Sequence, residues 1–255
     1  MKEDHKDFSV SIVIPTFYNI DTLPKTIKSI KNQKIKPKEV IVIDNNKKKL
    51  SKNLIKNLRK KYKINLKYLS FNGNPDNSRN YAVRKSISQL IAFIDDDDTW
   101  EPNYLSNNLK LFKKYDLDFI YTDMNIINLE DKIINKVKLP KKIKLESLFV
   151  FNQGFFCSNL IIKKDIFQKK GGFNSNSGSA DKELAICLAE QKYKYYINPR
   201  RLVNKRASNN QWSQNFYSML KNNYKFYNKY KNRVNYTLKF SMLKKMLKLF
   251  FKIFL

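Results

Sequence analysis

Short apolar runs, each followed by a longer segment of helical periodicity, dominate the first half of the chain. Between the first two runs, Leu23, Ile27 and Ile30 recur on one helical face after a candidate Asp21 cap. Another basic amphipathic helix follows the second run. Four runs are typical of buried strands: residues 10–14, 39–43, 65–69 and 90–94. Alternating strands and helices predict an α/β fold whose parallel sheet is covered on both faces.

Polar segments directly follow three of these strands, at residues 15–18, 44–46 and 95–98. Ligands of parallel sheets bind beyond the carboxyl ends of the strands. We therefore expect a binding site where these three segments meet.

The second half of the chain has a different pattern. A helix is predicted over residues 101–115 and a strand over 118–123, followed by hairpin-like pieces at 131–139 and 157–163. A glycine-bearing loop, KKGGFNSNSGSADKE, comes next. Because no linker rich in Pro, Gly or Ser separates the halves, we expect the second to complete the same domain.

A helix that starts at Tyr236 ends the chain. All of its lysines except Lys239 lie in one sector of the helical wheel, and Leu, Met, Phe and Ile cover most of the rest. A wide apolar face edged by lysines is typical of a helix that lies in the membrane interface. The alternative is a terminal helix packed on the domain or on a second copy of the chain.

Charge narrows the choice of partners. The 255 residues are 42% hydrophobic and include 51 Lys and Arg against 22 Asp and Glu, for a net charge of +29. This excess favours a polyanionic partner: nucleic acid, an anionic bilayer or a phosphate-rich substrate. A codon bias toward A and T is the alternative source of the lysines. The N-terminus is charged where a signal peptide needs apolar residues, and no run is long enough to span a membrane, so we expect a cytoplasmic protein.

Two residue types exclude much chemistry by their scarcity. Cys157 and Cys187 are far apart, which argues against a disulfide framework or a zinc ribbon. The only histidine is His5, at the N-terminus, so the sequence does not supply the histidines for a Ser-His-Asp triad or a His-ligated zinc site. Catalysis must rest on carboxylates, lysines or a metal held by oxygen ligands.

Four consecutive acids, Asp95 to Asp98, follow the strand at residues 90–94. Such a run is often a surface loop, but here it directly follows an apolar strand in a chain poor in acids. In extended backbone, side chains two apart share a face, so Asp95 and Asp97 are expected to converge while Asp96 and Asp98 turn elsewhere. Two converging carboxylates suit Mg²⁺ or Mn²⁺, with a phosphate completing the shell.

Four stretches together resemble one known family. SIVIPTFYNIDTLPKTIKSI, EVIVIDNN, NPDNSRNYAV and LIAFIDDDDTWEPNYL follow in the order and spacing of the family 2 glycosyltransferases with the GT-A fold. The resemblance is close over residues 9–105 and looser to about residue 206. It implies a Rossmann-like nucleotide-binding half with a mixed central sheet, an acceptor-binding half and a C-terminal helical extension.

The resemblance implies domain bounds. We expect a glycosyltransferase domain over residues 1–232, with the nucleotide-sugar-binding half at 9–123 and the acceptor half at 124–210. The amphipathic helix occupies residues 233–255.

The donor nucleotide is assigned to the strand ends by the resemblance. Pro15, Thr16 and Asp44 match the positions that hold the nucleoside, and Arg79 matches one that contacts the nucleotide. Asn45 replaces a second acid of many members. Its carbonyl oxygen can accept a hydrogen bond from a uracil N–H, so we still expect a UDP-sugar as the donor.

The family's Asp-x-Asp metal motif falls on Asp95, Asp96 and Asp97. Asp97 is the first choice as ligand of Mn²⁺ or Mg²⁺, with Asp95 oriented toward ribose or metal. Asp96 and Asp98 either cap the next helix or tune the site. Trp100 either packs beneath the acceptor sugar or fixes the next helix.

The general base of the family lies in an acidic pair after a Gly-Gly-Phe loop, which is reduced here to Ala180 and Asp181. Asp181 is the candidate base; its alternative role is helix capping, and Glu183 is the second candidate. Arg206 or Lys205 is expected to help hold the diphosphate.

The expected protein is an inverting glycosyltransferase of the hexosyltransferase type. It would use a nucleotide diphosphate sugar and a glycan or lipid-linked acceptor in bacterial surface polysaccharide or lipopolysaccharide synthesis, at the inner face of the cytoplasmic membrane. The terminal helix would bind an anionic membrane surface. We expect no binding of nucleic acid, and the sequence is compatible with an oligomer. Departures such as Tyr18, where the family usually has Asn, leave a non-catalytic nucleotide-sugar-binding module as the alternative, and a basic nucleic-acid-binding protein as another.

Overall fold

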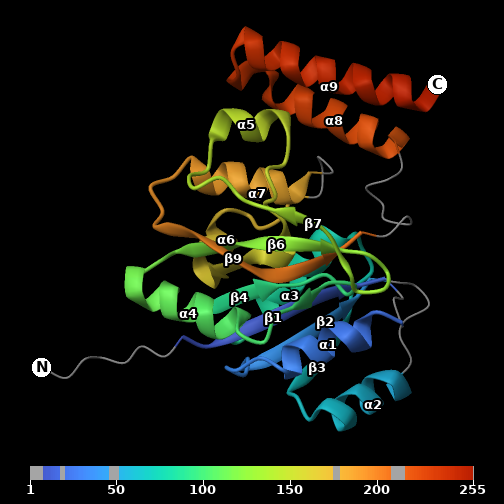
Figure 1. Cartoon of the computed structure of the whole chain (residues 1–255), viewed down its shortest axis with the longest axis vertical. Coiled ribbons are helices and arrows are strands. Elements are labelled where there is room, and N and C mark those ends of the chain that lie inside the picture. Colours follow the sequence, from blue (N-terminus) through green and yellow to red (C-terminus); the bar gives the residue numbers. More distant parts are fainter. Residues whose placement is uncertain (1–7, 18–20, 46–51, 175–178, 208–215, 255) are drawn as a thin grey trace, which may run out of the picture.

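The computed structural model of the chain describes residues 8–17, 21–45, 52–174, 179–207 and 216–254. Within them, one mixed sheet has the strand order β3-β2-β1-β4-β8-β6-β9-β5, with β7 paired to β6 (Figure 1). The strands are β1 (Val10–Thr16), β2 (Glu39–Asp44), β3 (Leu66–Ser70), β4 (Leu90–Phe93), β5 (Thr99–Trp100), β6 (Phe119–Ile127), β7 (Ile133–Val137), β8 (Leu160–Lys163) and β9 (Tyr195–Arg206). The mixed sheet expected from the resemblance is therefore present.

The first four strands run parallel, as the alternating pattern predicts. In β1, Ile12 and Ile14 belong to the core on one face of the sheet, whereas Val13 belongs to the core on the other face. Successive side chains of a strand point to opposite faces, so a strand that is apolar throughout must be covered on both.

Helices supply both covers. One core includes side chains of α1, α2 and α4, and the other includes side chains of α3, α5, α6, α7, α8 and α9. The helices are α1 (Leu23–Lys31), α2 (Lys52–Tyr62), α3 (Pro75–Lys85), α4 (Tyr104–Tyr115), α5 (Leu145–Val150), α6 (Lys164–Lys169), α7 (Ala180–Ala189), α8 (Phe216–Tyr230) and α9 (Tyr236–Phe254). The N-cap of α1 is Thr22, so the Asp21 cap expected from the sequence is wrong.

The second half of the chain completes the same sheet. β6 and β7 form the antiparallel hairpin predicted around residues 131–139. The second hairpin-like piece is instead a 3-10 turn, η1 (Cys157–Asn159), followed by β8. β8 is an interior strand, antiparallel to β4 and β6, and β9 then runs parallel to β6.

Two terminal helices stack at the end of the molecule farthest from α2 (Figure 1). α9 begins at Tyr236, as predicted, and packs against α5 and α8. α8 comes from a segment in which lysines and aromatic residues interleave. None of the helices in the described part of the chain combines the length and apolar character needed to cross a bilayer.

Candidate functional site

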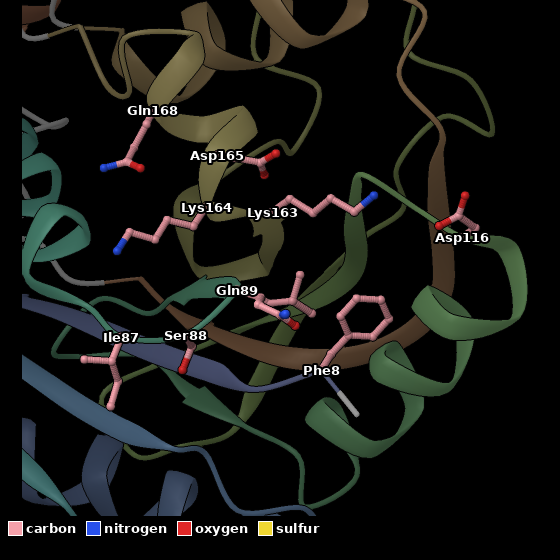
Figure 2. Close-up of a pocket in the computed structure, with 10 residues that line it drawn as sticks. Phe8, Ile87, Ser88, Gln89, Asp116, Lys163, Lys164, Asp165 and Gln168 are labelled. Atoms are coloured by element: carbon pink, nitrogen blue, oxygen red, sulfur yellow. The ribbon is translucent and has the colours of Figure 1, made fainter. Parts of the chain in front are cut away.

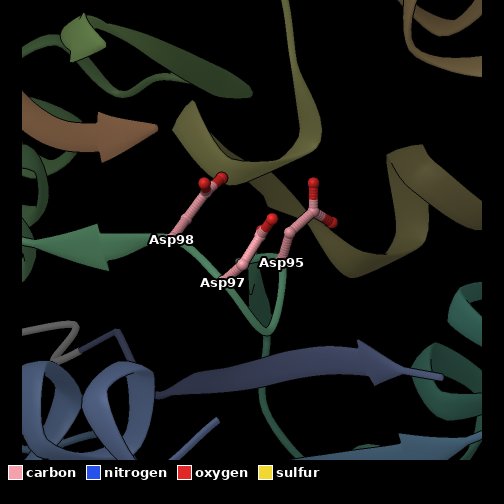
Figure 3. A group of neighbouring side chains, drawn as sticks. All are labelled: Asp95, Asp97 and Asp98. Atoms are coloured by element: carbon pink, nitrogen blue, oxygen red, sulfur yellow. The ribbon is translucent and has the colours of Figure 1, made fainter. Parts of the chain in front are cut away.

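A tight turn after β4 brings three carboxylates together. The Asp98 backbone N–H donates to the Asp95 carbonyl oxygen at 3.2 Å, so the chain reverses across Asp96 and Asp97. As a result Asp95, Asp97 and Asp98 each place a carboxylate oxygen within 4.8 Å of the others (Figure 3). We call these three residues the acid cluster.

The turn corrects one expectation from the sequence. Strand alternation predicted that Asp98 points away from Asp95 and Asp97, but β4 ends at Phe93 and the chain turns at Asp96 and Asp97. The reversal returns Asp98 to the cluster. Asp96 is buried, with 6% of its surface exposed, and does not belong to the cluster.

The η1 segment holds the first residue of the turn. The Asp95 backbone N–H donates to Ser158 Oγ at 3.0 Å, and the Cys157 thiol donates to Asp95 Oδ1 at 3.2 Å. The Trp100 indole N–H donates to the Ser158 carbonyl oxygen at 2.9 Å. Nothing in the sequence signalled that residues 157–159 reach the site, because a contact 62 residues away leaves no local pattern.

Two basic residues at the end of β9 have different places. Arg206 is 2% exposed, and its guanidinium donates to the carbonyl oxygens of Asp97 at 3.0 Å and Asn128 at 2.7 Å and pairs with Asp131. Arg206 therefore braces the turn from inside, and its contact with a diphosphate stays a prediction. Lys205 Nζ lies 3.7 Å from carboxylate oxygens of both Asp95 and Asp98.

Burial and these cations set the ionisation of the cluster. Burial alone would raise the pKa of Asp95, but the Arg79 guanidinium and the Lys205 ammonium hold it at about 2. Burial raises the pKa of Asp98 to about 7, against the opposing effect of Lys205. These two neighbouring carboxyl groups therefore differ in charge at neutral pH: Asp95 is ionised, whereas Asp98 is close to its pKa.

The acid cluster fits a hard divalent cation. Its ligand atoms are carboxylate oxygens, which Mg²⁺ and Mn²⁺ prefer. Asp98 Oδ2 is buried, and the Lys205 ammonium 3.7 Å away is too distant for a hydrogen bond, so a bound cation would stabilise the ionised carboxylate further. Asp97 and Asp95, the ligands expected from the sequence, lie in the cluster, and Asp98 joins them.

The ends of β1 and β2 form the neighbouring part of this edge. Thr16 and Asp44 stand side by side in the parallel register, and the Asn45 backbone N–H donates to the Thr16 carbonyl oxygen at 3.1 Å. The Tyr68 hydroxyl donates to Asp44 Oδ2 at 2.8 Å. Pro15 lies beside Thr16 in β1, so these four candidate donor-binding residues are together, and Tyr68 is an addition that the sequence did not indicate.

Arg79 joins α3 to the acid cluster. Its guanidinium donates to Asp95 Oδ1 at 2.6 Å and to Asp76 Oδ1 at 3.3 Å, and the Arg79 side chain is 11% exposed. The sequence assigned Arg79 to the nucleotide, but its observed partners are the carboxylates. It fixes the direction of the Asp95 side chain.

The next residue, Asn80, ties α3 to the glycine-bearing loop. Its side-chain amide donates to the Phe173 carbonyl oxygen at 2.8 Å and accepts from the Phe173 N–H at 2.9 Å. Gly172 has a φ of +69°, and a Cβ there would lie 2.3 Å from Asn80 Oδ1. Only glycine fits at this position.

Asp181 follows this loop as the second residue of α7. The N-cap of α7 is Ser179, so the capping role considered for Asp181 is wrong. Burial raises the pKa of Asp181 to about 7, with Arg79 opposing this and the negative charge of Asp95 adding to it. Asp181 is therefore within electrostatic reach of the acid cluster and poised between its two protonation states.

Glu183, the second candidate base, has a different environment. It is 2% exposed, and one carboxylate oxygen pairs with Lys229 of α8 at 2.8 Å. Asp181 keeps partial exposure. Of the two carboxylates, Asp181 is the one that a ligand can reach.

Trp100 lies in the interior. It is 3% exposed, and its ring stacks on Tyr104 of α4 with 4.1 Å between the ring centroids. This is the packing expected of a residue that fixes the next helix, the second of the two roles considered. His5 and Tyr18 lie outside the described residues.

A cavity of about 570 Å³ lies away from these residues, at the opposite edge of the sheet (Figure 2). Phe8, Ser88 and Lys164 help line it, at the amino ends of β1 and β4. Lys164 Nζ donates to the Ser86 carbonyl oxygen at 2.6 Å. Ligands of parallel strands bind at the carboxyl ends, so this cavity is not the candidate site.

Comparison with known families identifies one match. The model described as Glycosyl transferase family 2 matches residues 11–171. This segment includes the acid cluster and the ends of β1 and β2, and it ends before Asp181.

Relatives of known name agree with this match. An Escherichia coli O-antigen biosynthesis glycosyltransferase, WbnJ, is 28% identical over 65% of this chain and 66% of its own length. The Campylobacter jejuni GalNAc(5)-diNAcBac-PP-undecaprenol beta-1,3-glucosyltransferase is 27% identical over 74% of this chain and 62% of its own length. The chain thus spans less than two thirds of the length of these relatives.

A solved structure shares the fold. The S. aureus TarS fragment crystallised with UDP-GlcNAc superposes with a TM-score of 0.64 at 15% identity, covering 96% of this chain and 73% of the fragment. At this identity the likeness concerns the fold. The mixed sheet and its helices are therefore arranged as in the TarS fragment.

Proposed function

This chain belongs to glycosyl transferase family 2, and we propose that it transfers a sugar from a UDP-sugar to a hydroxyl of a glycan or lipid-linked acceptor, with inversion at the anomeric carbon. One observation carries the proposal. The acid cluster and Asp44 lie at the carboxyl ends of parallel strands of one sheet. The half-buried Asp181 carboxylate is within electrostatic reach of the acid cluster. This side combines the chemistry for a diphosphate, a nucleoside and a proton.

The relatives support a surface glycan as the product. The E. coli relative is named for O-antigen biosynthesis, and the C. jejuni relative is named for an undecaprenol diphosphate oligosaccharide. We propose a product of the same class, a bacterial polysaccharide or lipopolysaccharide built on a lipid carrier. The transfer would take place at the inner face of the cytoplasmic membrane.

Donor binding is assigned to the ends of β1 and β2. Asp44, held by the Tyr68 hydroxyl, presents a carboxylate toward the nucleoside, and the Asn45 carbonyl oxygen accepts from a uracil N–H. Thr16 Oγ1 is buried and has no hydrogen-bond partner among the described residues, which leaves it for the nucleotide. Lys205, already beside Asp95 and Asp98, supplies positive charge for the diphosphate.

Asp181 acts as the general base. It accepts the proton of the acceptor hydroxyl while the hydroxyl oxygen forms a bond to the anomeric carbon. The bond from that carbon to the diphosphate oxygen breaks, and the nucleoside diphosphate leaves with the electron pair. A base with a pKa of about 7 is well matched to proton transfer at neutral pH.

Asp97, Asp95 and Asp98 are the residues that would hold Mn²⁺ or Mg²⁺. The cation, when bound, supplies positive charge that stabilises the departing diphosphate. Arg79 keeps Asp95 ionised and oriented for this role.

A donor panel tests the proposal. Thermal stabilisation by nucleotide sugars with Mn²⁺ should identify the donor, and transfer of labelled sugar should then require Asp97 and Asp181. Asp97→Asn and Asp181→Asn should each lose transfer, whereas Asp165→Asn, which changes an exposed acid in α6 at the opposite edge of the sheet, should retain it.

Three outcomes would contradict the assignment. Wild-type rates in both variants would show that the site residues are wrong. Donor binding without transfer or hydrolysis would identify a non-catalytic module. Binding of oligonucleotides in place of nucleotide sugars would identify a nucleic-acid-binding protein.

A further inference from the structure

The outer side of α9 carries a continuous apolar stripe. Tyr236, Phe240, Leu243 and Leu247 are all exposed, Tyr236 by 82% and Phe240 by 59%. Their spacing of four, three and four residues places them on one side of a helix. We call these four residues the outer face of α9.

The opposite side of α9 is fixed to the protein. Met242 is 4% exposed within the core shared with α5, α7 and α8, and Lys245 Nζ donates to the Val150 carbonyl oxygen at 3.0 Å. The sequence left two alternatives open for this helix, a membrane-interface helix and a terminal helix packed on the domain or on a second copy. In the structure α9 lies on α5 and α8 (Figure 1), so that one part of its apolar surface is packed and another part is exposed.

The charged residues of the two terminal helices have one sign. The chain contains no Asp or Glu after Glu190, and every charged residue of α8 and α9 is basic. Lys244 is exposed on α9 beside the stripe, and Lys221 and Lys225 are exposed on α8. Each basic residue near an anionic bilayer strengthens binding by about fivefold.

This combination favours lipid over the other partners. A second copy would bring an equally basic surface against this one, and like charges repel. Nucleic acid would match the charge but would leave Leu243 and Leu247 without a stacking role, since stacking on bases uses aromatic rings. A bilayer interface takes both the apolar stripe and the lysines.

We propose that the outer face of α9 is a docking surface for an anionic lipid bilayer, with the helix lying flat in the interface. The four apolar side chains enter the headgroup region, and the lysines contact lipid phosphates. The lipid-linked nature of the acceptor is the one point on which this proposal rests on the proposed function. Binding of α9 to lipid itself needs no catalysis.

Vesicle co-sedimentation of the full chain tests the inference. The wild type should sediment with vesicles rich in phosphatidylglycerol, less with phosphatidylcholine alone, and less as salt rises. The variant Phe240→Ser/Leu243→Ser/Leu247→Ser should bind at least about tenfold more weakly, because three exposed apolar side chains are lost from the interface. Its melting temperature should stay near the wild-type value.

A matched control separates this face from general surface apolarity. Ile87→Ser/Leu129→Ser removes two side chains that are 64% and 66% exposed elsewhere, and it should bind vesicles as the wild type does. Lys244→Glu should weaken binding to phosphatidylglycerol selectively.

Several results would overturn the inference. One is equal vesicle binding by the wild type and the triple variant. Another is a dimer of the wild type in lipid-free solution that the triple variant dissociates, since this identifies a second copy as the partner. A third is a triple variant that loses oligonucleotide binding but binds vesicles as the wild type does. Transfer to a water-soluble acceptor should persist in the triple variant, so failure of lipid docking remains distinguishable from failure of the proposed function.

Discussion

Replacing Asp181 with asparagine should stop sugar transfer and at the same time stabilise the fold. Asparagine has nearly the shape of aspartic acid but carries no charge. Burial raises the pKa of Asp181 from an ordinary 3.8 to about 7, so the folded protein favours the neutral carboxyl group. The wild type is thus destabilised by the ionisation that catalysis requires.

The size of the effect follows from the two pKa values. An acid whose pKa is higher in the folded state contributes stability below pH 3.8 that is lost as the pH rises through about 7. The loss is about 1.5 kcal/mol near pH 5 and about 4 kcal/mol near pH 8 as an upper bound. Because Asp181 keeps partial exposure, we expect about 2 kcal/mol near pH 8, or a rise in melting temperature of about 6 °C in the variant.

Thermal unfolding and transfer assays over the same pH range measure both halves of the prediction. The advantage of Asp181→Asn should grow between about pH 4 and about pH 7 and then level off. Its transfer rate should fall about 100- to 10,000-fold, whereas the wild-type rate should rise with pH to a plateau with an apparent pKa near 7. Asp165→Asn, at an exposed position in α6, should change neither quantity.

Two results would refute the reasoning. A variant that is less stable than the wild type near pH 8 would mean that the folded protein uses the Asp181 charge rather than opposing it. Wild-type transfer by the variant would move the role of base to another carboxylate.

Three further substitutions test other parts of the site. Tyr68→Phe should raise KM for the donor by about tenfold or less, because Asp44 loses a hydrogen bond of 2.8 Å, and steady-state kinetics against Tyr224→Phe, at an exposed tyrosine, would measure it. Lys229→Met should lower the free energy of unfolding, measured in urea, by about 2 kcal/mol, because it leaves the Glu183 carboxylate buried without its cation. Lys221→Met, which replaces an exposed lysine of the same helix, should have little effect. Equal losses of stability in the two variants would contradict a stabilising Lys229–Glu183 ion pair. Gly172→Ala should destabilise the protein by about 2 kcal/mol more than Gly171→Ala, since both glycines have positive φ but only the Cβ at 172 meets Asn80; equal melting temperatures would contradict this steric argument.

The parallel half of the sheet could be predicted because its information is local. Ile12, Val13 and Ile14 are consecutive apolar residues, and only a strand covered on both faces uses such a run. The position of Asp95 and Asp97 at the carboxyl edge followed from the same logic. The beginning of α9 at Tyr236 was equally readable from its helical period.

The rest of the site depends on contacts between distant segments. Asp98 joins the acid cluster because the chain turns, and the alternation rule that set it apart holds only in extended backbone. Arg206 bonds to Asn128 and Asp131, partners about 75 residues away, and no local pattern in the sequence indicated these contacts. Cys157 and Ser158 support Asp95 from a segment with no motif at all.

The adjacent residues Arg79 and Asn80 have a consequence for building chimeric enzymes. Arg79 holds the acid turn, and Asn80 holds the backbone at Phe173, so one turn of α3 joins the two parts of the site. A hybrid that takes its amino-terminal half from this chain and its carboxyl-terminal half from a relative would separate Asn80 from Phe173. Such exchanges should preserve activity only when the incoming loop keeps a glycine at the position of Gly172 and so accepts the same amide clamp.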